Sequence, residues 1–247
     1  MISGAVLPHA PLLLEPLSSE ETRRAGAAVR SAAGTLDLGD VDLVVLVSPH
    51  GPRTGVYRAA AGSLDDLGVR GVEARRTTDE DALRAVARAW AVDVVDEPAD
   101  HGVVVPLLLR GWAAPVVAVC FEDRCGGGPP PQPAGELGGE LADAVAGLAG
   151  SGDVALVASC NGAIGLTPRA PLTELPEARA AELELIAALE EDVGLVEGAA
   201  LRLAEAGGSC ALGPLTVLAR LFSGRRGRVL AHECPVGVGY LVAEVAP

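Results

Sequence analysis

Residues 43–51 read Leu43-Val44-Val45-Leu46-Val47-Ser48-Pro49-His50-Gly51, and this stretch decides the expected fold. Its continuous apolar run is typical of a strand buried on both faces, because a half-exposed strand would alternate apolar and polar side chains. The proline and the glycine that follow favour a turn directly after the strand. We therefore predict a largely parallel sheet covered by helices, with a histidine at the end of one of its strands.

The chain repeats this pattern on both sides of that stretch. Apolar runs predict further strands at Ile2–Leu7, Val116–Phe121, Val154–Ser159, Arg228–His232 and Val238–Val245. Helices are predicted over Ser19–Ala33, Asp79–Trp90, Val103–Trp112, Glu136–Leu148, Glu177–Glu191, Glu197–Glu205 and Leu212–Phe222. This alternation favours the α/β class, with a mostly parallel mixed sheet flanked by helices on both faces.

Residues 1–247 are interpreted as one α/β domain. The low-complexity stretch Gly126–Pro133 is interpreted as a surface loop and not as a linker between domains. The reason is that strands of the same character continue after it, and connections within a domain run over the surface.

Composition excludes several classes of function. The formal net charge of −14 disfavours a nucleic-acid partner, because phosphate binding needs a clustered basic surface. The apolar runs are all shorter than the roughly 20 residues that span a bilayer, and no basic flank precedes the first of them, so neither a membrane segment nor a signal peptide is expected. The 5 cysteines have no zinc-type spacing, and their odd number fits a reducing compartment. We expect a cytoplasmic protein.

The histidines carry the strongest functional signal in the sequence. His9 and His50 each follow a predicted strand inside a proline-containing turn, His101 precedes a predicted helix, and His232 ends a predicted strand. Open α/β sheets bind ligands at strand ends, and imidazole is the commonest metal ligand in proteins. We therefore predict that His9 and His50 converge on a metal ion.

A third ligand is expected from the pair His232-Glu233 near the end of the chain. Glu233 is the best-placed carboxylate, and two imidazoles with one carboxylate suit non-haem Fe(II) and oxygen chemistry. His232 or Cys234 could serve in its place, because side chains alternate along a strand and Glu233 cannot point the same way as both neighbours. The spacing leaves this choice open.

At these residues the sequence resembles the LigB-like superfamily of class III extradiol ring-cleavage dioxygenases, with the closest match to actinobacterial members of unassigned role and a more distant one to the Memo-type branch. Five pieces carry the resemblance in the right order: Pro8-His9-Ala10-Pro11, Ser48-Pro49-His50-Gly51, Asp100-His101-Gly102 with Pro106-Leu107-Leu108, Leu166-Thr167-Pro168, and Pro235-Val236-Gly237-Val238-Gly239-Tyr240-Leu241. Together they span nearly the whole chain.

The resemblance implies a LigB-like fold and a mononuclear Fe(II) site, with zinc as the alternative metal. It implies a small catecholic substrate whose ring is opened with O2. His9, His50 and Glu233 would be the metal ligands, with His232 as the alternative, and His101 would contact the substrate or oxygen as the catalytic residue.

One departure from the family pattern separates the functional hypotheses. Catalytically active members carry a histidine after the strand that corresponds to Val154–Ser159, whereas this chain continues Cys160-Asn161-Gly162. General acid–base help is worth roughly 10²–10⁴-fold in rate, so its loss bears on ring cleavage more than on metal binding. The leading hypothesis is an extradiol-type enzyme. The alternatives are a metal-binding scaffold without catalysis and an α/β binding domain without metal, and each is compatible with a homo-oligomer.

Overall fold

A central group of parallel strands organises the protein, which is described by a computed structural model covering residues 1–14, 17, 19–122, 133–150, 152–171 and 173–247. The strands β1 (Ile2–Leu7), β2 (Leu43–Ser48), β7 (Val116–Cys120) and β8 (Val154–Ser159) run parallel in the spatial order β7-β2-β8-β1. The predicted α/β class with a large mixed sheet is confirmed.

Shorter or antiparallel strands extend this group at both edges. On one side β3 (Gly55–Tyr57) pairs antiparallel with β7, and β6 (Val94–Val95) pairs parallel with β3. On the other side β10 (Tyr240–Val245) pairs antiparallel with β1, and β9 (Gly227–Glu233) pairs antiparallel with β10. The full order is β6-β3-β7-β2-β8-β1-β10-β9, and β4 (Ala60–Ser63) and β5 (Glu73–Arg76) form a separate hairpin.

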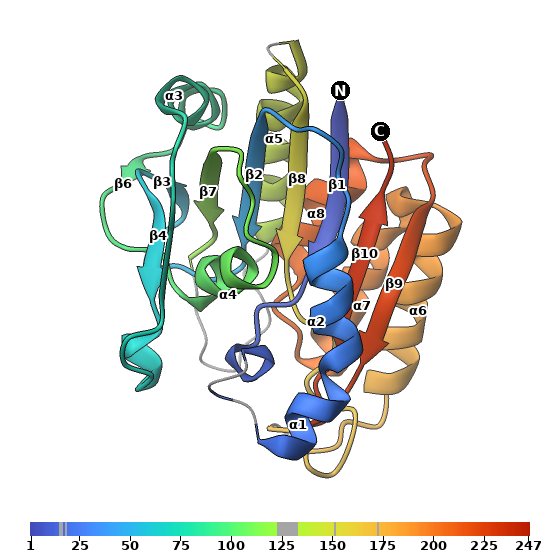
Figure 1. The fold of residues 1–247 in the computed structure, drawn as a ribbon. Helices are drawn as coiled ribbons and strands as arrows, with labels where there is room; N and C mark the ends of the chain where they lie inside the picture. Colours follow the sequence, from blue (N-terminus) through green and yellow to red (C-terminus); the bar gives the residue numbers. More distant parts are fainter. Residues whose placement is uncertain (15–16, 18, 123–132, 151, 172) are drawn as a thin grey trace.

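Helices cover both faces of the large sheet (Figure 1). One face packs against α2 (Ala27–Thr35) and α4 (His101–Arg110). The other packs against α3 (Glu80–Ala89), α5 (Pro133–Ala146), α6 (Ala178–Glu191), α7 (Val196–Gly207) and α8 (Leu212–Leu221). No helix among the described residues is long and apolar enough to cross a membrane.

The burial of β2 explains its unbroken apolar sequence. Val45 and Val47 belong to the core on one face of the sheet, whereas Val44 and Leu46 belong to the core on the other. All four side chains are fully buried. Because successive side chains of a strand point to opposite faces, a strand covered on both sides needs apolar residues at every position.

Helix starts follow the capping residues. Ser19 caps the short helix α1 (Glu20–Ala25) by accepting the Thr22 N–H, and Asp79 caps α3 by accepting two backbone N–H groups. Where one helix was predicted over Ser19–Ala33, the chain forms α1 and α2 with Gly26 between them, since glycine is a poor helix former. Helix α4 begins two residues earlier than predicted, because Asp100 caps it by accepting the Gly102 N–H.

Two parts of the chain differ from the prediction or lie beyond it. The strands β3 to β6 were not predicted, because runs of two to four residues carry too little periodicity to identify. Short 3₁₀ turns at Pro11–Leu13, Asp65–Leu67, Gly147–Gly150 and Val193–Leu195 complete the described elements. Residues 126–132 of the predicted loop Gly126–Pro133 lie outside the described residues, and Pro133 begins α5.

Candidate metal centre

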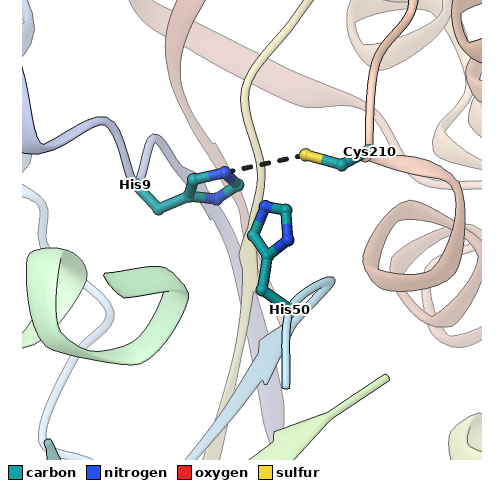
Figure 2. A group of neighbouring side chains, drawn as sticks. All are labelled: His9, His50 and Cys210. Atoms are coloured by element: carbon teal, nitrogen blue, oxygen red, sulfur yellow. Dashed lines mark hydrogen bonds between the residues drawn. The ribbon is translucent and has the colours of Figure 1, made fainter. Parts of the chain in front are cut away.

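His9 and His50 converge at the carboxyl edge of the parallel strands (Figure 2). His9 follows β1 and His50 follows β2, and these two strands lie on either side of β8. Their ring centroids are 4.9 Å apart, and the side chains are almost fully buried at 1% and 6% exposure. Two imidazoles that are distant in sequence therefore meet over the end of β8, as the sequence predicts.

Cys210 supplies the third donor atom of this group. It lies in the connection between α7 and α8, and its Sγ is 3.6 Å from His9 Nε2. Figure 2 marks this contact with a dashed line. The donor atoms of His9, His50 and Cys210 all lie within 4.8 Å of one another. A Zn–S bond of about 2.3 Å and a Zn–N bond of about 2.0–2.1 Å at the tetrahedral angle would separate S and N by about 3.6 Å. The group could therefore hold a metal ion with little rearrangement.

His101 lies against the other two imidazoles and nearer to solvent. Its ring centroid is 4.7 Å from that of His50 and 5.4 Å from that of His9, and its side chain is 22% exposed. Its Nδ1 is 3.2 Å from Asp100 Oδ2. His50, Asp100 and His101 form a second compact group of donors, but Asp100 and His101 are already engaged with each other. This group is better described as a carboxylate–histidine pair beside the first group.

Burial keeps His9 in the form that binds a metal. Burial is the main cause that holds the pKa of His9 well below its ordinary value of about 6.5, and positive charge on His50 or His101 would lower this pKa further. A hydrogen bond with Ser159 acts in the opposite direction but does not outweigh them. His9 is therefore a neutral imidazole at neutral pH, which is the form with a lone pair to donate.

Local turns fix the backbone of both ligands. The Ser48 hydroxyl accepts the His50 N–H and donates to the His50 carbonyl, both at 3.1 Å, so the turn after β2 closes on its own side chain. The His9 N–H donates to Asn161 Oδ1 at 3.2 Å, which ties the turn after β1 to the loop after β8. These bonds hold the backbone of His9 and of His50 in place at the ends of their strands.

Cys210 is held by the same loop. The Ser209 hydroxyl donates to the Asn161 carbonyl at 2.9 Å and accepts the Ala211 N–H at 3.1 Å. The segment before α8 is thereby attached to the loop that follows β8. Because Asn161 also bonds His9, one residue connects the two ends of the His9–Cys210 contact.

The expected third ligands His232 and Glu233 belong to neither donor group among the described residues. His232 Nε2 instead bonds Glu182 Oε1 at 2.9 Å, and Glu182 is a buried side chain of α6. Strand β9 does end at the same edge of the sheet as β1, but it lies three strand positions from β8. At about 4.8 Å per position this is about 14 Å from the centre of the site. In this structure Cys210, and not this pair, lies with His9 and His50 as the third donor.

The sequence analysis did not identify Cys210 as a candidate ligand, because its local sequence gives little indication of this role. The residue stands between two predicted helices without a cysteine partner at zinc-type spacing. Two other cysteines, Cys120 and Cys160, are fully buried, and burial raises the pKa of each thiol well above its ordinary value. Cys210 differs in being partly exposed and beside an imidazole, which only the fold makes visible.

The fold and the site together define an α/β protein with a candidate metal centre at the carboxyl edge of its sheet. No protein-family model matches the sequence, and no curated protein matches it. Among solved structures it is similar to the uncharacterized protein JW3007 from Escherichia coli K12, with a TM-score of 0.60 and 15% sequence identity over 100% of both chains. This similarity establishes a shared fold.

Proposed function

We propose that this chain is a metal-binding protein whose ion is held by His9, His50 and Cys210. The observation that carries the proposal is the donor geometry: two buried imidazoles and a thiol lie within 4.8 Å of one another. A thiolate and a neutral imidazole 3.6 Å apart match two ligands of one tetrahedral ion.

The donor set favours zinc or copper over iron. A thiolate is a soft ligand that selects Zn(II) or Cu(I), whereas the non-haem Fe(II) sites that activate oxygen use two histidines and a carboxylate. Among the described residues, the carboxylate that lies within the donor groups is Asp100, which already accepts the Gly102 N–H and contacts His101. The residues therefore fit a thiolate-philic ion better than the Fe(II) that the family resemblance implies.

A second candidate function is an extradiol-type oxygenase that acts on a small dihydroxylated aromatic with O2. The observation that favours it is the position of His101, whose ring lies against His50 and whose side chain is partly open to solvent. A bound ion would supply Lewis acidity and adjacent positions for two reactants, and His101 would contact one of them. Cys210 in place of a carboxylate, and the absence of a histidine after Ser159, both weigh against this candidate.

Metal titration of the reduced protein tests the first proposal. We expect one Zn(II) or Cu(I) per chain, with tighter binding than Fe(II) in competition with a chromophoric chelator. Cys210→Ser should weaken Zn(II) binding by more than the about 100-fold that loss of an outer partner produces. In Co(II)-substituted protein the thiolate charge-transfer band should be present in the wild type and absent in this variant.

Cys234→Ser is the matched control, because Cys234 is a partly exposed free thiol outside both donor groups. It should leave the affinity and the Co(II) spectrum unchanged. Substoichiometric metal under every loading condition, or equal binding by wild type and Cys210→Ser, would contradict the proposal. Oxygen uptake by the anaerobically Fe(II)-loaded protein with a panel of catechols decides the second candidate, and no uptake in any case would reject it.

A further inference from the structure

The backbone of Gly102 links the two groups of histidines. Its N–H donates to Asp100 Oδ1 at 2.9 Å, and its carbonyl accepts the Ser159 hydroxyl at 2.5 Å. Asp100 contacts His101, and Ser159 contacts His9. One residue at the start of α4 therefore connects to an imidazole through each of its two backbone groups.

The Ser159 bond determines where His9 carries its proton. A hydroxyl has one proton to donate, and Ser159 gives it to the Gly102 carbonyl, which can only accept. Ser159 Oγ must then act as acceptor toward His9 Nδ1, 3.3 Å away. His9 therefore carries its proton on Nδ1, and Nε2 is the nitrogen with a lone pair toward Cys210.

Asp100 favours one tautomer of His101 through its charge. The carboxylate has only acceptor oxygens, one of which is used by the Gly102 N–H. The other lies 3.2 Å from His101 Nδ1, and a carboxylate oxygen at this distance favours a proton on that nitrogen over a lone pair. The remaining nitrogen of His101, Nε2, is left without a proton when the imidazole is neutral.

We propose that Ser159 and Asp100, both held by the Gly102 backbone, are positioning residues that fix His9 and His101 as the Nδ1-protonated tautomers. The inference rests on the proposed metal centre for its functional meaning. Metal-binding histidines commonly donate their second ring N–H to such a partner, which orients the ring and strengthens the ligand. The structure adds that the partners of the ligand His9 and of its neighbour His101 both bond to the backbone of one residue, Gly102.

The tautomers can be measured in metal-free protein at mildly alkaline pH by long-range ¹H–¹⁵N correlation spectra, with assignments from variants that lack each histidine. In the wild type, His9 and His101 should both be protonated on Nδ1. Asp100→Asn should move the proton of His101 to Nε2, because the Gly102 N–H requires the amide oxygen and leaves the amide N–H₂ facing Nδ1. Asp79→Asn is the matched control, since Asp79 caps α3 without contacting a histidine.

Metal affinity tests the role of Ser159. Ser159→Ala should weaken Zn(II) binding about 10-fold to 100-fold, the usual effect of losing the partner that orients a metal-binding histidine, because the bond from Ser159 Oγ to His9 Nδ1 is lost. Ser3→Ala is the control, since Ser3 is a buried β1 residue that also donates to a backbone carbonyl. It should leave the affinity unchanged.

The two proposals fail in different ways. Wild-type spectra with the proton of His9 or His101 on Nε2 would overturn the inference even if the protein binds metal, and this measurement needs no variant to fold. An unshifted His101 in Asp100→Asn, or equal affinity for Ser159→Ala and Ser3→Ala, would also overturn it. The expected tautomers in a protein that binds no metal would instead reject the metal centre and leave the hydrogen-bond assignment standing.

Discussion

Gly102 lies so close to Ser48 that only a residue without a side chain fits there. A Cβ at this position would lie 2.1 Å from Ser48 Oγ. Ser48 Oγ cannot move away cheaply, because it holds both the N–H and the carbonyl of His50. Each residue of Asp100-His101-Gly102 therefore has a structural role. Asp100 caps α4, His101 places an imidazole beside the site, and Gly102 lets the helix approach β2.

Gly102→Ala should therefore destabilise the fold and weaken metal binding. We expect a loss of about 1–3 kcal/mol in the free energy of unfolding, the usual effect of overpacking a buried position. Gly139→Ala is the matched control, because Gly139 lies within α5 and a Cβ there meets nothing within 4 Å. Alanine should stabilise that helix slightly. Denaturant titration of both variants measures the difference, and equal midpoints would contradict the crowding at Gly102.

At the residue scale the sequence predicted much of the site. His9 and His50 were identifiable because histidines in proline-containing turns after strands point to a common edge, whereas His101 was identified by the family resemblance. Cys210 and Ser159 were not, since neither residue type is informative without a neighbour. Their roles arise from contacts of 3.6 Å and 3.3 Å with His9, across 201 and 150 residues of chain.

At the scale of elements, a buried carboxyl joins three segments that border the site. Glu182 on α6 is 2% exposed and accepts the Ala163 N–H at 2.6 Å as well as bonding His232 on β9. Ala163 belongs to the loop after β8, the loop whose Asn161 holds His9. His232, which was predicted as an alternative metal ligand, therefore connects the edge strand β9 to this loop through Glu182 on α6.

Replacing Glu182 by leucine should destabilise the protein strongly. His232 Nε2 and the Ala163 N–H would both lose their acceptor, and a buried donor left without an acceptor costs about 1–3 kcal/mol. Glu182→Gln should retain more stability, since its amide oxygen can still accept the Ala163 N–H. Glu184→Gln, on the same helix but paired with Arg202 at the surface, should have a much smaller effect. Urea midpoints that rank Leu and Gln at position 182 equally would contradict this account.

The positions of strands with long apolar runs could be predicted from the sequence. The order in which the strands lie in the sheet could not. The predicted bounds Ile2–Leu7, Leu43–Ser48 and Val154–Ser159 coincide with β1, β2 and β8, because continuous apolar runs end abruptly at turn residues. The sequence does not state that β8 lies between β1 and β2, or that β9 lies at the outer edge. That order places His232 away from the centre and brings the Cys210 loop, through α8 packed on β8, over it.

At the scale of the whole molecule, the site occupies the position that parallel sheets provide for ligands. His9 and His50 project from strands on both sides of β8, at the carboxyl edge where open α/β sheets bind their ligands. The sheet is covered on both faces, so the imidazoles that reach this edge are buried although they follow the strands in turns. Burial of a titratable ligand then makes the stability of the molecule depend on pH.

The metal-free protein should lose stability as the pH falls below about 6.5. The pKa of His9 is lowered in the folded state, chiefly by burial, whereas in the unfolded chain it stays near the ordinary value. Between these two pKa values the unfolded state binds more protons, so the free energy of unfolding decreases as the pH falls. The contribution of His9 is fully present above about pH 6.5, and the slope for one proton is at most about 1.4 kcal/mol per pH unit.

His9→Gln isolates this contribution, because glutamine has similar polarity and does not titrate. Plots of unfolding free energy against pH, from denaturant titrations with a strong chelator present, should be shallower for the variant than for the wild type between about pH 7 and pH 5. Ser3→Ala, which weakens the fold without removing a titratable group, should run parallel to the wild type. If the His9→Gln curve is also parallel, then His9 takes up its proton in the folded protein as readily as in the unfolded chain. A metal ion and a proton compete for the same imidazole, so the pH at which His9 takes up its proton also limits how far the pH can fall before the metal centre loses this ligand.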